Sequence, residues 1–222
     1  MKQSGPKTGL LGGSFNPAHG GHRRITLFAM DALGLDEAWW LVSPGNPLKP
    51  KAGMAPLAAR MKSAQRQARR APIRVTAIER QLGSPYTVDT LRALRRRWPG
   101  RRFLWLMGSD NLAQFHRWKD WRAIARQMPI AVIERPGYHR LALASPAMAW
   151  LRRYRESAAS FRSRGEWSVP ALIELRFDPD PRSATVIRCA DPDWPGRFGG
   201  APVRDQVTFD IVRSDPGRKA AR

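Results

Sequence analysis

A glycine-rich segment near the amino terminus, residues 12–22 (GGSFNPAHGGH), contains two of the four histidines in the chain. Gly12 and Gly13 let the backbone approach a ligand closely, and a helix that begins near Gly20 directs its free N–H groups toward the same place. Helix starts of this kind bind anions. His19 and His22 are three residues apart, so both imidazoles can face one anion and donate hydrogen bonds to phosphate oxygens. The segment therefore predicts a phosphate-binding site.

Two standard nucleotide-binding patterns do not occur in this turn. The Walker pattern GxxxxGK(S/T) and the dinucleotide pattern GxGxxG are both missing, although either would also place glycines between a strand and a helix. The alternative to a phosphate site is a tight glycine turn in which the histidines serve only as helix caps.

The elements that must position this turn follow from the hydrophobic pattern. A helix is expected over residues 20–33, ended by Gly34, a second begins at Pro56, and a third is capped by Thr87 and stops before Pro99. Strands are expected at residues 8–11, 38–42, 73–77, 103–107, 130–133 and 172–177. This order predicts an α/β fold, a Rossmann-like doubly wound parallel sheet with helices on both faces. Ligands of such sheets bind outside the carboxyl ends of the strands.

The charge of the chain is strongly positive, with 39 Lys and Arg against 18 Asp and Glu and a formal net charge of +21. Seven of the basic residues are lysines, and such an arginine bias is typical of GC-rich coding. The alternative is attraction to nucleic acid, anionic membranes or phosphorylated small molecules. The densest basic runs, residues 66–70 and 92–102, fall on expected exposed helix faces, so the charge alone favours no nucleic-acid partner beyond non-specific attraction.

The remaining composition concerns compartment and domain organisation. The longest strongly apolar runs have four or five residues, far below the roughly 18 to 20 that span a bilayer, and no secretory signal is recognisable. With one cysteine, Cys189, we expect a cytoplasmic protein with no membrane partner. Residues 1–190 are expected to form a single domain that begins with a short polar tail. Residues 191–222, rich in Pro and Gly, are expected to be a loosely ordered C-terminal segment.

Two motifs resemble those of a known superfamily. Residues 12–22 resemble the GG(S/T)F(D/N)PxHxGH signature of the nucleotidyltransferases, and residues 183–188 (SATVIR) resemble their second, SSTxIR-like motif. Three further stretches resemble bacterial nicotinate-nucleotide adenylyltransferases: residues 86–91 (YTVDTL), residues 108–111 (GSDN) and Trp118 in FHRWKDW. The resemblance covers about residues 7–188.

The resemblance implies transfer of the adenylyl group of ATP to nicotinate mononucleotide, giving nicotinate adenine dinucleotide and pyrophosphate in NAD biosynthesis. The phosphate of the mononucleotide is already the nucleophile, so the protein must orient two anions and stabilise charge. The implied cofactor is Mg²⁺ carried by the ATP phosphates, because Mg²⁺ seldom needs a protein cage. No metal site on the protein is expected.

The resemblance also implies roles for individual residues. Asp110 would accept both hydroxyls of the ATP ribose, Trp118 would stack on the pyridine ring, and backbone N–H groups near Thr87 would meet the ring carboxylate. The structural alternatives are a helix N-cap for Asp110, a core position for Trp118 and a solvated loop position for Lys49. The full assignment is His19, His22 and Arg188 as catalytic; Gly12, Gly13, Ser14, Phe15, Gly21, Gly108, Asp110, Ser183 and Thr185 as ATP-binding; and Asn16, Asn46, Lys49, Thr87 and Trp118 as mononucleotide-binding.

The chain departs from the family pattern at three places. Leu48 stands where the family often has histidine in PH(K/R), Ala184 replaces the middle serine of the second motif, and no LVPxxVxxYI-like run follows Arg188. Two alternative functions stay open at this point. One is the same reaction with another acceptor, nicotinamide mononucleotide or phosphopantetheine, and the other is a basic nucleic-acid-binding module. The motif at residues 86–91 and Trp118 argue against phosphopantetheine.

Overall fold

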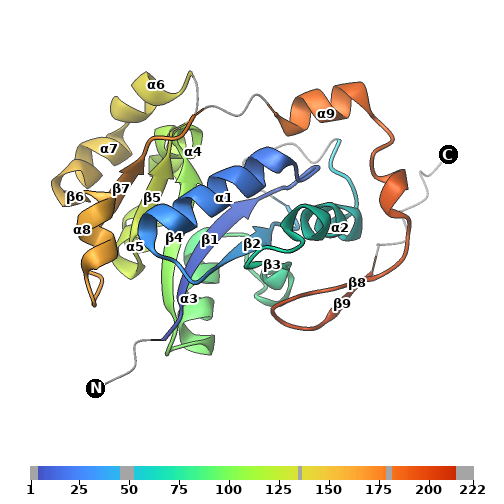
Figure 1. The fold of residues 1–222 in the computed structure, drawn as a ribbon, viewed down its shortest axis with the longest axis horizontal. Coiled ribbons are helices and arrows are strands. Elements are labelled where there is room, and N and C mark those ends of the chain that lie inside the picture. The colour runs from blue at the N-terminus through green and yellow to red at the C-terminus, as the bar shows by residue number, and fades with distance from the viewer. Residues whose placement is uncertain (1–4, 46–52, 135–136, 179–181, 214–222) are drawn as a thin grey trace.

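The structure is a computed structural model that describes residues 5–45, 53–134, 137–178 and 182–213. In these ranges seven parallel strands form one sheet in the order β3-β2-β1-β4-β5-β7-β6 (Figure 1). The strands are β1 (Lys7–Gly13), β2 (Glu37–Val42), β3 (Ile73–Thr76), β4 (Arg102–Gly108), β5 (Ile130–Ile133), β6 (Arg155–Glu156) and β7 (Leu172–Leu175).

The helices cover both faces of this sheet. The α-helices are α1 (Gly20–Leu33), α2 (Leu57–Ala68), α3 (Thr87–Arg97), α4 (Ser109–Gln114), α5 (Trp121–Gln127), α6 (His139–Leu143), α7 (Pro146–Leu151), α8 (Ala158–Ser163) and α9 (Ala184–Ala190). Single 3₁₀ turns are η1 (Ile78–Gln81), η2 (Phe115–Arg117), η3 (Arg152–Tyr154) and η4 (Gly196–Phe198), and a hairpin joins β8 (Val203–Arg204) to β9 (Ile211–Val212). The predicted doubly wound parallel α/β fold is confirmed.

Two apolar layers hold the sheet between the helices. One layer packs Leu33 of α1 and Met61 of α2 against Trp40 of β2, and the other packs Leu91 of α3 and Ile124 of α5 against the opposite face. The central strands β2 and β4 are buried along almost their whole length, as expected where helices cover both faces of a parallel sheet. In Figure 1, α1 crosses in front of β1 while α3 lies on the far side.

The strand order creates a topological switch point between β1 and β4. From β1 the chain winds outward through β2 to β3, then returns to β4 on the other side of β1. The loops that leave the carboxyl ends of β1 and β4 therefore run in opposite directions and open a crevice between the two strand ends. The turn at residues 12–22 leaves the end of β1, so the fold places the predicted phosphate site at this crevice.

Most of the expected helix boundaries are confirmed, but one cap is not. Helix α1 spans Gly20–Leu33 and ends at Gly34, whose φ of 63° is the left-handed conformation that glycine favours. Thr87 was expected to cap the third helix, and this is wrong because the N-cap is Tyr86 and Thr87 is the first helical residue. No side chain caps α3; the Ser84 hydroxyl, just before the helix, accepts from the Tyr86 N–H and donates to the Asp89 carboxylate in the first turn.

The expectation of a loosely ordered segment after residue 190 is wrong for residues 191–213. Trp194, Val203 and Val212 are buried, and the hairpin that contains β8 and β9 lies against α2 and β3. Its anchor is the Asp205 carboxylate, which is 2% exposed and accepts hydrogen bonds from Thr76 Oγ1, the Ala77 N–H and two N–H groups of its own turn. One buried carboxylate and a few scattered apolar residues hold this segment. Its sequence therefore lacks the regular spacing of apolar residues that predicts a helix or a strand. Residues 214–222 lie outside the described residues.

No helix among the described residues has the length and apolar character needed to cross a bilayer.

Candidate active site

The turn after β1 packs tightly against tryptophans of the neighbouring strands β4 and β2. A Cβ at Gly12 would lie 2.7 Å from the Trp105 ring, so this position accepts only glycine without a shift of the indole. Phe15, with a φ of 47°, turns the chain, and its ring is 2% exposed and stacks on Trp40 at 5.1 Å. Any contact of Phe15 with ATP therefore involves its backbone, while the ring anchors the turn in the core.

The two histidines of this turn lie against each other at the start of α1. The ring centroids of His19 and His22 are 3.9 Å apart, and His22 also packs on Phe15 at 5.0 Å. The backbone N–H of His19 donates to Nδ1 of His22 at 3.2 Å. Because Nδ1 accepts this hydrogen bond, the proton of the neutral imidazole is on Nε2. His22 therefore presents an N–H donor on the side of the ring away from the backbone.

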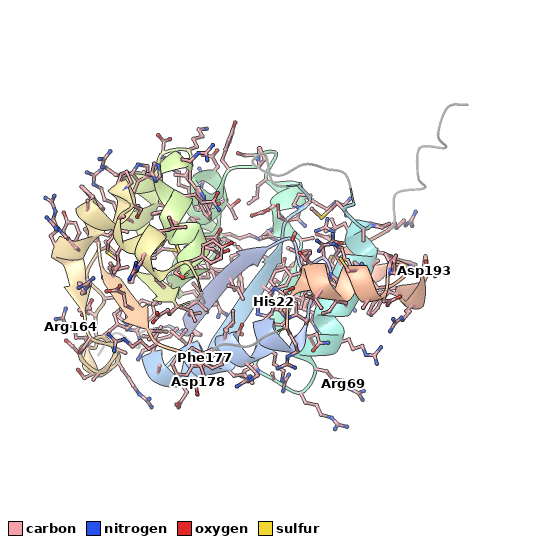
Figure 2. All side chains as sticks on the ribbon, turned by 90° about the horizontal axis from the view of Figure 1, so that it is seen from above. His22, Arg69, Arg164, Phe177, Asp178 and Asp193 are labelled. Carbon is pink, nitrogen blue, oxygen red and sulfur yellow. The ribbon has the colours of Figure 1, made fainter. Side chains whose placement is uncertain are left out.

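The second motif comes to the same turn from the far end of the chain. Arg188 of α9 donates from Nη1 to the carbonyl of Asn16 at 2.6 Å and from Nη2 to Thr185 Oγ1 at 3.2 Å. Ser183 is the N-cap of α9, where its hydroxyl accepts from the Val186 N–H. Figure 2 shows His22 toward the middle of the molecule, seen from above, and Asp193 beyond α9 at the edge. Arg188 and Asn16, which are 172 positions apart in the sequence, thus meet in the turn before α1.

A cavity of about 290 Å³ opens beside this turn, between the carboxyl ends of β1 and β4. Trp118 forms one wall, and its indole is fixed edge-on by Phe115 at 5.4 Å and Trp105 at 6.3 Å. Thr87, at the start of α3, also lines the cavity. The lining residues are Gly12, Gly13, Ser14, Ser43, Glu79, Pro85, Tyr86, Thr87, Trp105, Asn111, Arg117, Trp118 and Lys119. The structure therefore brings Gly12, Gly13, Ser14, Thr87 and Trp118 of the predicted set together.

The carboxyl end of β4 holds two further predicted residues. Gly108 ends the strand and is the N-cap of α4, and Asp110 is the second residue of that helix. The alternative of Asp110 as the N-cap is therefore wrong. Gly21 is buried in the first turn of α1, and Asn46 and Lys49 lie outside the described residues.

Asn16 uses its side chain inside the protein. Its amide donates to the carbonyl of Gly53 at 2.9 Å and accepts from the N–H of Ala55 at 3.1 Å. It is 5% exposed. Asn16 thus ties the turn after β1 to the segment that leads into α2, and its predicted contact with the mononucleotide stays a prediction.

Arg60 was missed in the sequence, although it connects three segments around this site. Its guanidinium is 1% exposed and donates to the carbonyls of Ser14, Ser43 and Ala55 at 2.7 to 2.9 Å. Burial lowers its pKa to about 10. The available signal was a basic residue on the apolar side of α2, next to Met61.

Glu79 was also missed, and it is the acidic residue of the cavity wall. Burial raises the pKa of this carboxyl to about 7, against a smaller opposing effect of a hydrogen bond with Ser43. The neutral form is therefore well populated near neutral pH. Glu79 follows β3 by three residues, so the signal was its position just beyond the carboxyl end of a strand.

The fold and the site define a class, the nucleotidyltransferases: the model of the cytidylyltransferase-like family matches residues 10–190. A protein of Erythrobacter litoralis named "Probable nicotinate-nucleotide adenylyltransferase" is 72% identical over 206 residues, which are 93% of this chain and 94% of that protein. A protein of Bradyrhizobium sp. with the same name is 46% identical over 188 residues, 85% of this chain and 98% of that protein. The chain belongs to the nicotinate-nucleotide adenylyltransferase family.

Solved structures agree with the fold. Plasmodium falciparum nicotinic acid mononucleotide adenylyltransferase complexed with NaAD superposes with a TM-score of 0.59 over 83% of each chain, at 14% sequence identity. The same enzyme complexed with APC gives a TM-score of 0.57. At this identity the likeness shows a shared architecture and nothing about individual side chains.

Proposed function

We propose that this chain transfers the adenylyl group of ATP to nicotinate mononucleotide, forming nicotinate adenine dinucleotide and pyrophosphate in NAD biosynthesis. The observation that carries the proposal is the meeting of the two motifs, in which Arg188 bonds to the turn that also presents His19 and His22. The names of the two relatives indicate that the acceptor is nicotinate mononucleotide. The cytoplasm, where ATP and mononucleotides are made, is the proposed compartment.

The reaction needs charge stabilisation and no strong base. An oxygen of the mononucleotide phosphate attacks the α-phosphorus of ATP, the bond from that phosphorus to the bridging oxygen breaks, and pyrophosphate leaves with the electron pair. The Nε2–H of His22, the imidazole of His19 and the guanidinium of Arg188 are donors for the charge that develops on these oxygens. The first turn of α1 adds backbone N–H groups directed at the same place. Fixed donors of this kind act without reorganisation during the step.

The two substrates occupy the two sides of the crevice in this proposal. The adenosine side contains Gly108 and Asp110 at the end of β4, where the carboxylate accepts the ribose hydroxyls, and the second motif with Ser183 and Thr185 on α9. The nicotinate ring enters the cavity beside Trp118, whose indole offers a flat face for stacking.

Magnesium enters as part of the substrate MgATP. Among the residues that the structure describes, no group of three or more His, Cys, Asp or Glu side chains could hold a metal ion. Mg²⁺ bound to nucleotides commonly keeps triphosphate oxygens and water as its ligands. The chain's own contribution is to hold the triphosphate.

A coupled assay tests the proposal, with ATP and each acceptor in turn. We expect product with nicotinate mononucleotide and a kcat/KM roughly 10²-fold higher than with nicotinamide mononucleotide, because donors built for a carboxylate stay unpaired beside an amide. Equal rates would assign a dual-specificity enzyme, and product only with phosphopantetheine would overturn the acceptor. Nucleic-acid affinity that falls with log[salt] at a slope near −0.9 per phosphate contacted, without transferase activity, would favour the binding-module alternative.

A further inference from the structure

The cavity beside Trp118 has two walls that come from separate segments of the chain. We call residues 84–87, which end at the first residue of α3, the turn wall, and residues 117–119, which begin at the last residue of η2, the indole wall. Tyr86 and Thr87 line the cavity from the turn wall, and Arg117, Trp118 and Lys119 line it from the indole wall. The width of the acceptor cavity therefore depends on what holds the two walls together.

One carboxylate connects them. Oδ2 of Asp89 accepts a hydrogen bond from Ser84 Oγ in the turn wall at 2.7 Å and pairs with Lys119 Nζ in the indole wall at 3.4 Å. The hydrogen bond from Ser84, helped by the charges of Lys119 and Arg92, lowers the pKa of Asp89. The carboxylate is thus ionised at neutral pH, and it does not itself line the cavity.

The second connection uses the same ammonium group. Lys119 Nζ lies 4.5 Å from the centre of the Tyr86 ring, a cation–π distance. Lys119 thus bridges from the indole wall to both the carboxylate and the aromatic ring of the turn wall. This arrangement keeps a positive charge beside a cavity whose acidic side chain, Glu79, has its pKa raised to about 7 by burial.

From this geometry we infer that Asp89 is a positioning residue for the acceptor, which fixes the distance between the two walls and holds the Lys119 ammonium where it favours an anionic acceptor. The inference rests on the proposed function, because it needs the acceptor in this cavity. It gives a role to the acidic residue of the YTVDTL stretch, which the site residues assigned from the sequence leave unused.

The ion pair contributes little to folding, which makes the inference testable. The side chains of Asp89 and Lys119 are 28% and 47% exposed, and pairs of this exposure add little to stability. The helices on either side are held by apolar contacts, since Val88, Leu91 and Ile124 are fully buried. Loss of the pair should therefore change acceptor binding and leave the fold intact.

The other oxygen of the same carboxylate offers a matched control. Oδ1 of Asp89 pairs with Arg92 Nη1 at 3.2 Å, and Arg92 does not line the acceptor cavity. Arg92→Met removes an ion pair of the same carboxylate on the outer side, while Lys119→Met removes the pair that joins the walls. Asp89→Asn keeps the shape and removes the charge from both.

The experiment measures steady-state kinetics with ATP and nicotinate mononucleotide, together with thermal melts. We expect Asp89→Asn and Lys119→Met each to raise the KM for the mononucleotide about fivefold, with the KM for ATP and kcat within about twofold of the wild type. Because both changes break the same Asp89–Lys119 pair, the double variant should be little worse than Lys119→Met alone. Arg92→Met should behave as the wild type.

Three results would overturn the inference. They are an unchanged KM for the mononucleotide in Asp89→Asn, an equal rise in both KM values with a lowered melting temperature, and an Arg92→Met variant that matches Lys119→Met. Absence of turnover by the wild-type enzyme with nicotinate mononucleotide would instead refute the proposed function, so the two failures are distinguishable.

Discussion

Replacement of Arg60 by methionine is expected to destabilise the protein and disorganise its phosphate site together. The guanidinium donates to carbonyls on three segments: Ser14 in the turn after β1, Ser43 after β2 and Ala55 before α2. Methionine fills much of the same volume and donates no hydrogen bond. All three carbonyls, which are partly buried, would then lose their bond to a cation that is itself only 1% exposed.

The magnitude follows from these three bonds. A hydrogen bond to a charged group contributes about 1.5 to 3 kcal/mol, and an unsatisfied buried acceptor costs a similar amount. Burial of the cation opposes this gain, as the pKa lowered to about 10 indicates. We therefore expect a net loss of about 3 kcal/mol, which for a chain of this length lowers the melting temperature by about 6 to 12 °C.

Thermal melts and initial rates test this expectation. Arg66→Met is the matched control, because Arg66 is on the same helix and exposed, and surface changes of this kind stay within about 0.5 kcal/mol. Arg60→Lys keeps the charge and loses the fork of donors, so its melting temperature should fall between those of the methionine variant and the wild type. If Arg60→Met melted within about 2 °C of Arg66→Met, the carbonyl bonds would not carry the stability assigned to them.

Three further predictions follow from residues of the site and the C-terminal segment. His22→Ala should stay folded and lower kcat by roughly 10²-fold, because a fixed transition-state donor contributes about 3 kcal/mol; normal turnover would remove His22 from the chemistry. For Glu79, the folded state keeps a proton from pH 4.5 up to about 7 that the unfolded state releases, so its free energy of unfolding falls as pH rises through that range. Glu79→Gln should therefore gain stability over the wild type between pH 5 and 8 in urea titrations, by up to about 3 kcal/mol, and a difference independent of pH would contradict this. Asp205→Ala should lower stability by about 2 to 4 kcal/mol, since its carboxylate accepts four buried or half-buried bonds, and truncation after Ala190 should do at least as much; a melt unchanged by truncation would show that residues 191–213 add nothing.

The sequence was sufficient for six of the seven strands of the sheet, because parallel strands covered on both faces are mostly apolar. The run FLWLM at residues 103–107 is an example, and it corresponds to β4. The edge strand β6 (Arg155–Glu156), which consists of two charged residues, was not predicted. The β8–β9 hairpin could not be predicted in this way, since its anchor Asp205 bonds to Thr76, 129 residues away. The spacing of apolar residues within a short segment cannot predict a hydrogen bond between residues so far apart in the sequence.

In the site, too, some residues were predicted from the sequence and others were missed. The resemblance of residues 12–22 and 183–188 to two motifs of one superfamily predicted that the first turn and Arg188 act together, and the structure joins them through the carbonyl of Asn16. Arg60 and Glu79 were missed because a polar residue on a buried face looks like an interruption of the hydrophobic pattern. Thr87 was assigned to the wrong cap position because Ser84, two residues before the N-cap, already binds the first turn of α3.

The contact of the C-terminal hairpin with β3 has a consequence for how the chain is made. β3 is the edge strand of the sheet, and Gln206 bonds to both the N–H and the carbonyl of Val75. On the ribosome, residues 203–213 emerge long after β3, so the nascent chain carries an open strand edge for most of its synthesis, and open edges pair with other chains. A ribosome that stalls, or a protease that cuts, before residue 203 would leave this edge exposed beside η1 and the acceptor cavity. Protection of the β3 edge therefore depends on one of the last segments of the chain to emerge.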